Sequence, residues 1–173
     1  MSEKVEDGAR RPARQGRDDK RLARSAARLA AVQALYQMEL TGAGLSTVRA
    51  EFETHRLGAE IEGTQYREAD IALFRDLLEG AVRAQVKIDH LTDRALVARW
   101  PLGRIDATLR ALFRAAGHEL TGRRDIPPKV VIGEYVDIAK AFFAGKEPGF
   151  VNGVLDHMAR EARPDEMQAR RTP

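Results

Sequence analysis

The order of apolar and polar residues predicts a chain of helices. Over most of the sequence, apolar side chains recur every three or four residues, and no segment sustains the period-two alternation of a strand. The first helical segment starts near Lys20 and ends at Gly42 and Gly44, and its alanines would let a second helix approach closely. Its larger apolar positions are Leu22, Leu29, Val32, Leu35, Tyr36 and Leu40.

Proline and glycine mark the boundaries of the later helices. Pro101 should break one segment, the Pro127-Pro128 pair should begin another, and Gly145 should end it, because proline is tolerated only in the first turn of a helix. A polar connection is expected at 58–65. The helices predicted after the first lie at about 47–57, 67–88, 91–100, 105–120, 128–144 and 150–163.

The expected fold is therefore all-α, a bundle of about seven helices in two packed halves that meet at Pro101. Residues 1–19 are polar and have almost no apolar anchor, so we expect a disordered basic tail there. Residues 20–163 should form the helical domain, and residues 164–173 should be a frayed C-terminus.

Positive charge is concentrated at the start of the chain. Residues 1–28 hold nine Lys or Arg against five Asp or Glu, a net charge of +4, whereas the whole chain carries +3. No acidic residue lies between Lys20 and Glu39. Such a cluster is typical of a protein that binds a polyanion. A solubilising tail is an equal alternative on charge alone.

The sequence offers no sign of catalysis. It contains no cysteine, and none of its four histidines has another histidine four residues away. It also has no glycine-rich phosphate loop and no Gly-x-Ser-x-Gly elbow. No stretch is apolar enough to span a membrane, and no secretory signal is visible. We therefore expect a cytoplasmic binding protein without a metal or cofactor.

Two blocks of sequence resemble the NusB family over about residues 21–160. The first is the alanine- and arginine-rich stretch 23–28 with 31–37. The second joins Asp-Ile-Pro-Pro-Lys-Val-Val-Ile at 125–132 to Phe-Val-Asn-Gly-Val-Leu-Asp at 150–156. The chain departs from the family pattern at Ser25 and Ala26, where basic residues are usual, and at Gly133, where asparagine is usual.

The resemblance implies a seven-helix, non-enzymatic protein that takes part in transcription antitermination, especially in ribosomal RNA operons. It implies binding to the single-stranded boxA element of nascent RNA, together with NusE, a small-subunit ribosomal protein. The complex would then act on RNA polymerase with other Nus factors. Whether the chain is a monomer or a homodimer stays open.

The residues suited to RNA phosphates lie at the start of the first helix. Lys20, Arg21, Arg24 and Arg28 are spaced by one, three and four residues, so they could form one basic stripe, and Arg24 or Arg28 could also stack on a base. Tyr36 is a candidate for base stacking and equally a candidate for the core.

Further candidates lie in the second block. Phe150 could present its ring to a base or a partner, or act as a hydrophobic staple, and Asn152 could read a base edge or cap a helix. Weaker candidates for phosphate contact are Arg114, Lys129 and Lys146. Trp100 and Arg104 are proposed anchors for the protein partner, although Trp100 could equally fill the core.

These assignments require the basic helix start and the tip of the last helix to form one continuous face. Two other functions stay open. The chain could be a helical protein–protein adaptor with a basic tail. It could also be a stand-alone relative of the NusB-like domain of RNA 5-methylcytosine methyltransferases, but such catalysis needs a cysteine and a cofactor domain, and the chain lacks both.

Overall fold

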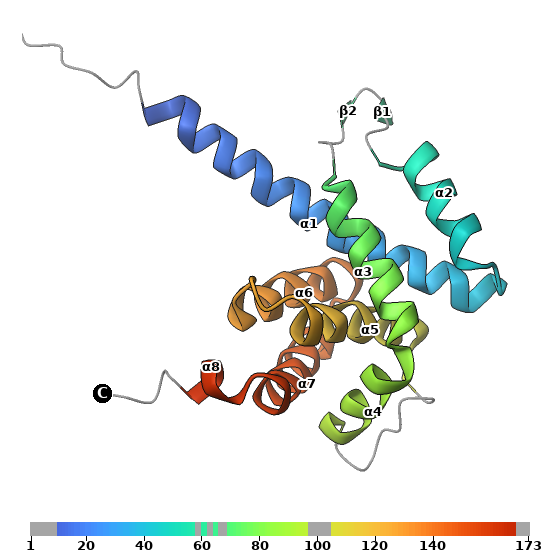
Figure 1. The fold of residues 1–173 in the computed structure, drawn as a ribbon, viewed down its shortest axis with the longest axis vertical. Coiled ribbons are helices and arrows are strands. Elements are labelled where there is room, and N and C mark those ends of the chain that lie inside the picture. The colour runs from blue at the N-terminus through green and yellow to red at the C-terminus, as the bar shows by residue number, and fades with distance from the viewer. Residues whose placement is uncertain (1–9, 58–59, 62–63, 66–68, 97–104, 169–173) are drawn as a thin grey trace, which may run out of the picture.

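The computed structural model describes residues 10–57, 60–61, 64–65, 69–96 and 105–168. This part of the chain is almost entirely helical, which confirms the all-α prediction (Figure 1). The elements are α1 (Arg10–Thr41), α2 (Leu45–His55), β1 (Glu60–Ile61), β2 (Thr64–Gln65), α3 (Ile71–Arg83), α4 (Gln85–Ala95), α5 (Ala107–Gly122), α6 (Pro128–Phe142), α7 (Glu147–Ala162) and α8 (Pro164–Gln168).

Helix α5 is the centre of the bundle. It packs against α1, α3, α4, α6 and α7, and most of its side chains are buried. Gly117 allows one close contact of this kind, because a Cβ there would lie 2.4 Å from Cγ2 of Ile88 in α4. One continuous apolar core runs from α1 to α7, so the two halves expected on either side of Pro101 share a single core.

Helix α1 has two halves with different surroundings. Residues 10–24, here called the projecting half, extend away from the bundle, and the described side chains from 13 to 22 are all exposed (Figure 1). Residues 25–41, the packed half, lie across the bundle and bury Ala27, Ala31, Val32 and Ala34 completely.

The prediction of disorder for residues 1–19 is wrong for 10–19, which are helical. Extending an existing helix adds one hydrogen bond for each residue fixed, whereas nucleation is costly. The packed half therefore supplies a nucleus from which the arginines, alanines and glutamine upstream continue the helix. Pro12 lies in the first turn, where proline is tolerated.

Three smaller expectations also need correction. The connection at 58–65 contains a two-residue antiparallel pairing of β1 with β2, and the helix predicted to reach Ile88 is divided at Ala84. The predicted frayed end contains α8, so the described residues form eight helices where about seven were expected. Arg163 holds α8 in place, because its Nε and Nη2 each donate to the Glu166 carboxylate at 2.8 Å.

No helix in the described part of the chain has both the length and the apolar character needed to cross a membrane.

Candidate nucleic-acid interface

A buried ion pair joins the packed half of α1 to α5 and α6. Arg28 in α1 is 2% exposed, and its Nη2 lies 2.6 Å from Oε1 of Glu119 in α5, which is fully buried. The Tyr135 hydroxyl in α6 donates to Oε2 of the same carboxylate at 2.9 Å. Three helices therefore meet at one carboxylate that is both neutralised and hydrogen-bonded, the condition for keeping a charge in a protein core.

The ionisation of these groups follows from their burial and their partners. Burial alone would lower the pKa of Arg28, but its hydrogen bonds to Glu119 and the negative charge of that residue outweigh burial, so the pKa is raised. Burial, reinforced by the Glu119 carboxylate, raises the pKa of Tyr135 well above its ordinary value. The tyrosine hydroxyl therefore stays protonated and donates its hydrogen bond at neutral pH.

Glu134 of α6 extends this network towards the surface. Its carboxylate lies 3.7 Å from Nη1 of Arg28 and accepts a hydrogen bond of 2.8 Å from the Ser25 hydroxyl. Ser25 occupies a position where the family resemblance suggested a basic residue. In this chain it instead connects α1 to α6 at the point where the projecting half begins.

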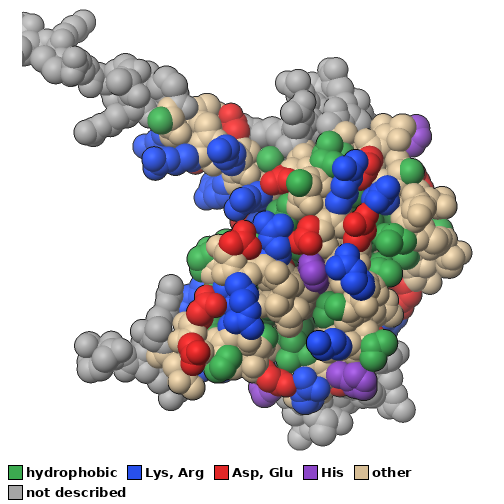
Figure 2. Space-filling view, in the orientation of Figure 1, with side chains coloured by type: hydrophobic (Ala, Val, Ile, Leu, Met, Phe, Trp, Pro, Cys, Tyr) green, Lys and Arg blue, Asp and Glu red, His purple; other side chains and the backbone are tan. Residues whose placement is uncertain are grey.

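A groove of about 430 Å³ lies between the projecting half of α1 and the start of α6. Its α1 side is lined by Arg17, Lys20, Arg21 and Arg24, with the buried Arg28 at its end. Figure 2 shows basic side chains along the edge of the projecting helix that borders the hollow beside the bundle. The described part of the chain thus presents a cationic wall that a phosphate chain could follow.

The other side of the groove comes from the loop after α5 and the first turn of α6. It is lined by Asp125, Ile126, Pro127, Val130 and Glu134. Ile126 is 3% exposed and forms part of the floor, whereas Val130 is 46% exposed. This wall is apolar with carboxylates at its edges, and it differs clearly from the α1 wall.

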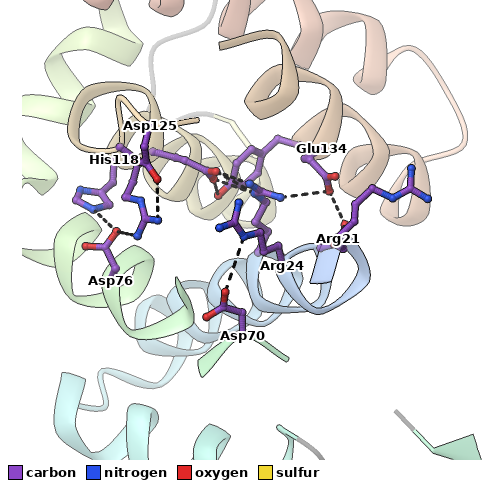
Figure 3. A network of polar contacts seen from close by, with 12 residues as sticks. Arg21, Arg24, Asp70, Asp76, His118, Asp125 and Glu134 are labelled. Atoms are coloured by element: carbon purple, nitrogen blue, oxygen red, sulfur yellow. Dashed lines mark hydrogen bonds and ion pairs between the residues drawn. The ribbon is translucent and has the colours of Figure 1, made fainter. Parts of the chain in front are cut away.

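Carboxylates pair with Arg24 and with Arg123 beside the groove (Figure 3). Asp70 caps α3 by accepting from the Leu73 backbone N–H, and its own N–H donates to the Ala23 carbonyl of α1. Its carboxylate lies 3.9 Å from Nε of Arg24, which turns towards it. These contacts anchor α3 to α1 near the junction of the projecting half and the packed half.

On the opposite wall, Nη2 of Arg123 lies 3.2 Å from Asp125, and its Nη1 lies 3.3 Å from Asp76. The hydrogen bond from Arg123 is the main cause that lowers the pKa of Asp125, and the attraction of the same guanidinium adds to it. Asp125 is therefore ionised at neutral pH. Asp76 also lies 3.4 Å from Nε2 of His118, which connects this cluster to α5.

The predicted basic stripe is divided by the structure. Lys20 and Arg21 are exposed, Arg24 is 47% exposed, and all three line the groove, where they are available to phosphates. Arg28 does not belong with them, because its guanidinium is buried and bound to Glu119. Its assignment to a phosphate or a base is wrong: release from Glu119 would leave an uncompensated charge in the core.

The residues of the second block lie in two other places. Lys146 and Phe150 line a cavity of about 510 Å³ with the start of α5, and the Phe150 ring meets Phe113 edge-on at 6.2 Å between centroids. Lys129 and Asn152 are exposed and line a smaller cavity of about 230 Å³ between α6, α7 and α8. Asn152 lies inside α7, which begins at Glu147, so it is not a helix cap.

The described residues do not place the two blocks in one cavity, so the expected continuous face stays a prediction. Helix α6 packs against both α1 and α7 and lies between them (Figure 1). The groove beside α1 and the two cavities beside α7 are separate, and no residue lines more than one of these three. Whether Lys129, Lys146, Phe150 and Asn152 contact RNA stays a prediction.

Tyr36 and Arg114 make contacts within the protein that explain their positions without RNA. Tyr36 is half-buried and packs against the core, as its alternative interpretation expected. Arg114 bonds to Asp89 through Nε and Nη2, each at 3.0 Å, and its Nη1 lies 3.3 Å from Glu39. With its side chain 15% exposed, it is not available to a phosphate. Trp100 and Arg104 lie outside the described residues.

Sequence reasoning missed several groove residues. Arg17 was assigned to the disordered tail, although its spacing of four residues from Arg21 is a helical signal. Asp125, Val130 and Glu134 carried no local signal, because only the packing of α1 beside α6 brings them to the groove.

These features define a helical protein with a projecting cationic helix and a groove at its base. Residues 25–160 match the model of the NusB family. The transcription antitermination protein NusB of Bradyrhizobium sp. (strain ORS 278) is 56% identical over 158 residues, which cover 91% of this chain and 94% of that protein. The protein of the same name from Rhodopseudomonas palustris (strain BisB18) is 58% identical over 143 residues, covering 83% and 85%.

Solved structures agree with these relatives. NusB of T. maritima superimposes with a TM-score of 0.67 at 29% identity, covering 87% of this chain and 96% of that one. A crystal structure of antitermination factors NusB and NusE with double-stranded RNA contains a chain of the same fold, with a TM-score of 0.66 at 24% identity, covering 80% and 97%. The chain belongs to the NusB family.

Proposed function

We propose that this chain is an RNA-binding transcription antitermination factor and that the projecting half of α1 is its main phosphate-binding element. The observation that carries the proposal is the cationic wall of the groove, where Arg17, Lys20 and Arg21 are exposed. Long basic side chains on a helix that is open to solvent can approach a phosphate chain at little desolvation cost.

The proposed RNA is a single-stranded boxA-type element, and the proposed protein partner is NusE. The resemblance to the NusB family supports the first, and a solved structure of NusB and NusE with double-stranded RNA supports the second. The assembly would act on RNA polymerase with other Nus factors, notably on ribosomal RNA operons. The chain would then work in the cytoplasm as a binding protein and not as an enzyme.

The test is a titration of a boxA-type RNA and a scrambled RNA of equal length, each with and without NusE, at several salt concentrations. We expect tighter binding of the boxA-type RNA and a steep loss of affinity as salt rises. Arg17→Ala, Lys20→Ala and Arg21→Ala should each reduce the slope of log K against log salt by roughly 0.7 for every phosphate of the single strand that the variant no longer neutralises.

Lys87→Ala is the matched control, because Lys87 is exposed on α4, away from the groove. It should leave the salt slope unchanged. If neither RNA binds with or without NusE, the RNA-binding function is wrong. If the protein binds NusE but neither RNA, the alternative of a protein–protein adaptor is favoured.

A further inference from the structure

The groove at the base of α1 has two walls of different chemistry. Arg17, Lys20 and Arg21 line one wall, whereas Pro127 and Val130 from the start of α6 line the other. Val130 is 46% exposed, and a branched apolar side chain at that exposure is available to an apolar partner. A ligand with one anionic end and one flat, partly apolar end fits both walls at once.

Carboxylates decide which end of such a ligand faces which wall. Asp125 and Glu134 border the apolar wall, with side chains that are 61% and 20% exposed. An ionised carboxylate repels a phosphate, but it accepts hydrogen bonds from amino groups. Phosphates are therefore favoured only on the α1 wall, and the α6 wall is left for a base.

We propose that this groove holds one unpaired nucleotide of the RNA, with its phosphate on the α1 wall and its base against Pro127 and Val130. The inference rests on the proposed function and adds the orientation of the strand to it. A volume of about 430 Å³ lies within the range of roughly 300–1,000 Å³ typical of sites for small ligands.

The arrangement also predicts which base is preferred. A base packed on Val130 has its edge near Asp125 or Glu134, and carboxylates are suited to the exocyclic amino group of cytosine. Uracil has no amino group to donate. Because the base must leave its stack to enter the groove, a single strand should bind more tightly than a duplex of the same sequence.

The experiment is an abasic scan of the boxA-type RNA, in which each base in turn is removed while its phosphate stays. With the unmodified protein, removal of the base in the groove should weaken binding roughly three- to tenfold, as expected when an apolar surface of this size is no longer covered. Val130→Ala should lower affinity for the intact RNA by a similar factor and abolish the penalty at that position alone. Its salt slope should not change.

Two matched variants separate the walls. Val86→Ala removes the same two methyl groups from a residue that is 71% exposed on α4, and it should leave every abasic penalty unchanged. Lys20→Ala should lower the salt slope but keep the penalty at the groove position. Uridine in place of cytidine at that position should weaken binding, and Asp125→Asn should reduce the difference.

The inference is overturned if Val130→Ala, like Val86→Ala, leaves every abasic penalty unchanged. It is also overturned if Lys20→Ala removes the penalty at the groove position while Val130→Ala does not. The proposed function survives either result, provided that the unmodified protein binds boxA-type RNA more tightly than the scrambled RNA. Failure of the unmodified protein to bind either RNA would reject both.

Discussion

Arg24 and Arg28 lie about one turn apart on α1, yet the Arg24 side chain is 47% exposed and the Arg28 side chain is 2% exposed. Arg24 lies at the end of the projecting half and borders the groove, whereas Arg28 lies in the packed half and neutralises Glu119. The two halves carry the same residue type for opposite purposes. A basic stripe along one helix is therefore not by itself a nucleic-acid site.

The comparison predicts its largest effect for Arg28→Ala. This change should lower the free energy of unfolding by about 3–5 kcal/mol, because it leaves the Glu119 carboxylate buried without its ion-pair partner. Arg21→Ala in the projecting half should change it by about 0.5 kcal/mol or less. Chemical denaturation of both variants measures the difference. If the Arg28→Ala protein kept ordinary stability but failed to bind RNA, Arg28 would belong to the RNA site and not to the core.

A smaller loss of stability is expected for Tyr135→Phe. The phenylalanine keeps the packing of the ring but removes the hydroxyl that donates to Glu119. Leaving part of a buried carboxylate without a donor should cost about 1–3 kcal/mol. The measurement is the same denaturation experiment. A loss greater than that of Arg28→Ala would mean that the hydroxyl, and not the guanidinium, is the main partner of Glu119.

The end of the packed half should respond to acid. Glu39 accepts hydrogen bonds from Arg110 of α5, and these bonds are the main cause that lowers its pKa below the ordinary value of 4.5. A lowered pKa contributes stability that is complete above the ordinary value and is lost as the pH falls through the folded-state value. Glu39→Gln should therefore cost about 1 kcal/mol or less at pH 7.

The difference in the free energy of unfolding between Glu39→Gln and the unmodified protein should shrink as the pH is lowered from 7 through 4.5 and below, because the glutamate is protonated first in the unfolded chain and then in the folded one. Denaturation curves at each pH give the two free energies. A difference that stays constant over this range would show that packing, and not charge, is responsible.

The smallest effects are expected for two glycines. A Cβ at Gly133 in α6 or Gly16 in the projecting half of α1 would meet nothing within 4 Å. Gly133→Ala should raise the free energy of unfolding by up to about 1 kcal/mol through helix propensity. Gly16→Ala should increase the hydrogen-exchange protection of its own helical turns without stabilising the bundle. If Gly16→Ala raised the free energy of unfolding as much as Gly133→Ala does, both halves of α1 would unfold together with the bundle.

The local pattern of the sequence was sufficient for most of the fold. The spacing of apolar residues and the positions of Pro128 and Gly145 predicted the helices and their approximate ends, because helix periodicity and breaking are local properties. The resemblance of residues 125–132 and 150–156 to the NusB family was sufficient for the family itself. Lys20 and Arg21 are exposed, as their proposed contact with phosphates requires.

The tertiary structure decided which charges face solvent and which are buried. Nothing near Arg28 in the sequence indicates that Glu119, 91 residues later, lies against it, or that α6 separates α1 from Phe150 and Asn152. The apolar wall at Val130 likewise exists only because α1 passes beside the start of α6. Helices form from local spacing, but a groove forms from the way distant helices pack, and that packing depends on contacts between residues far apart in the chain.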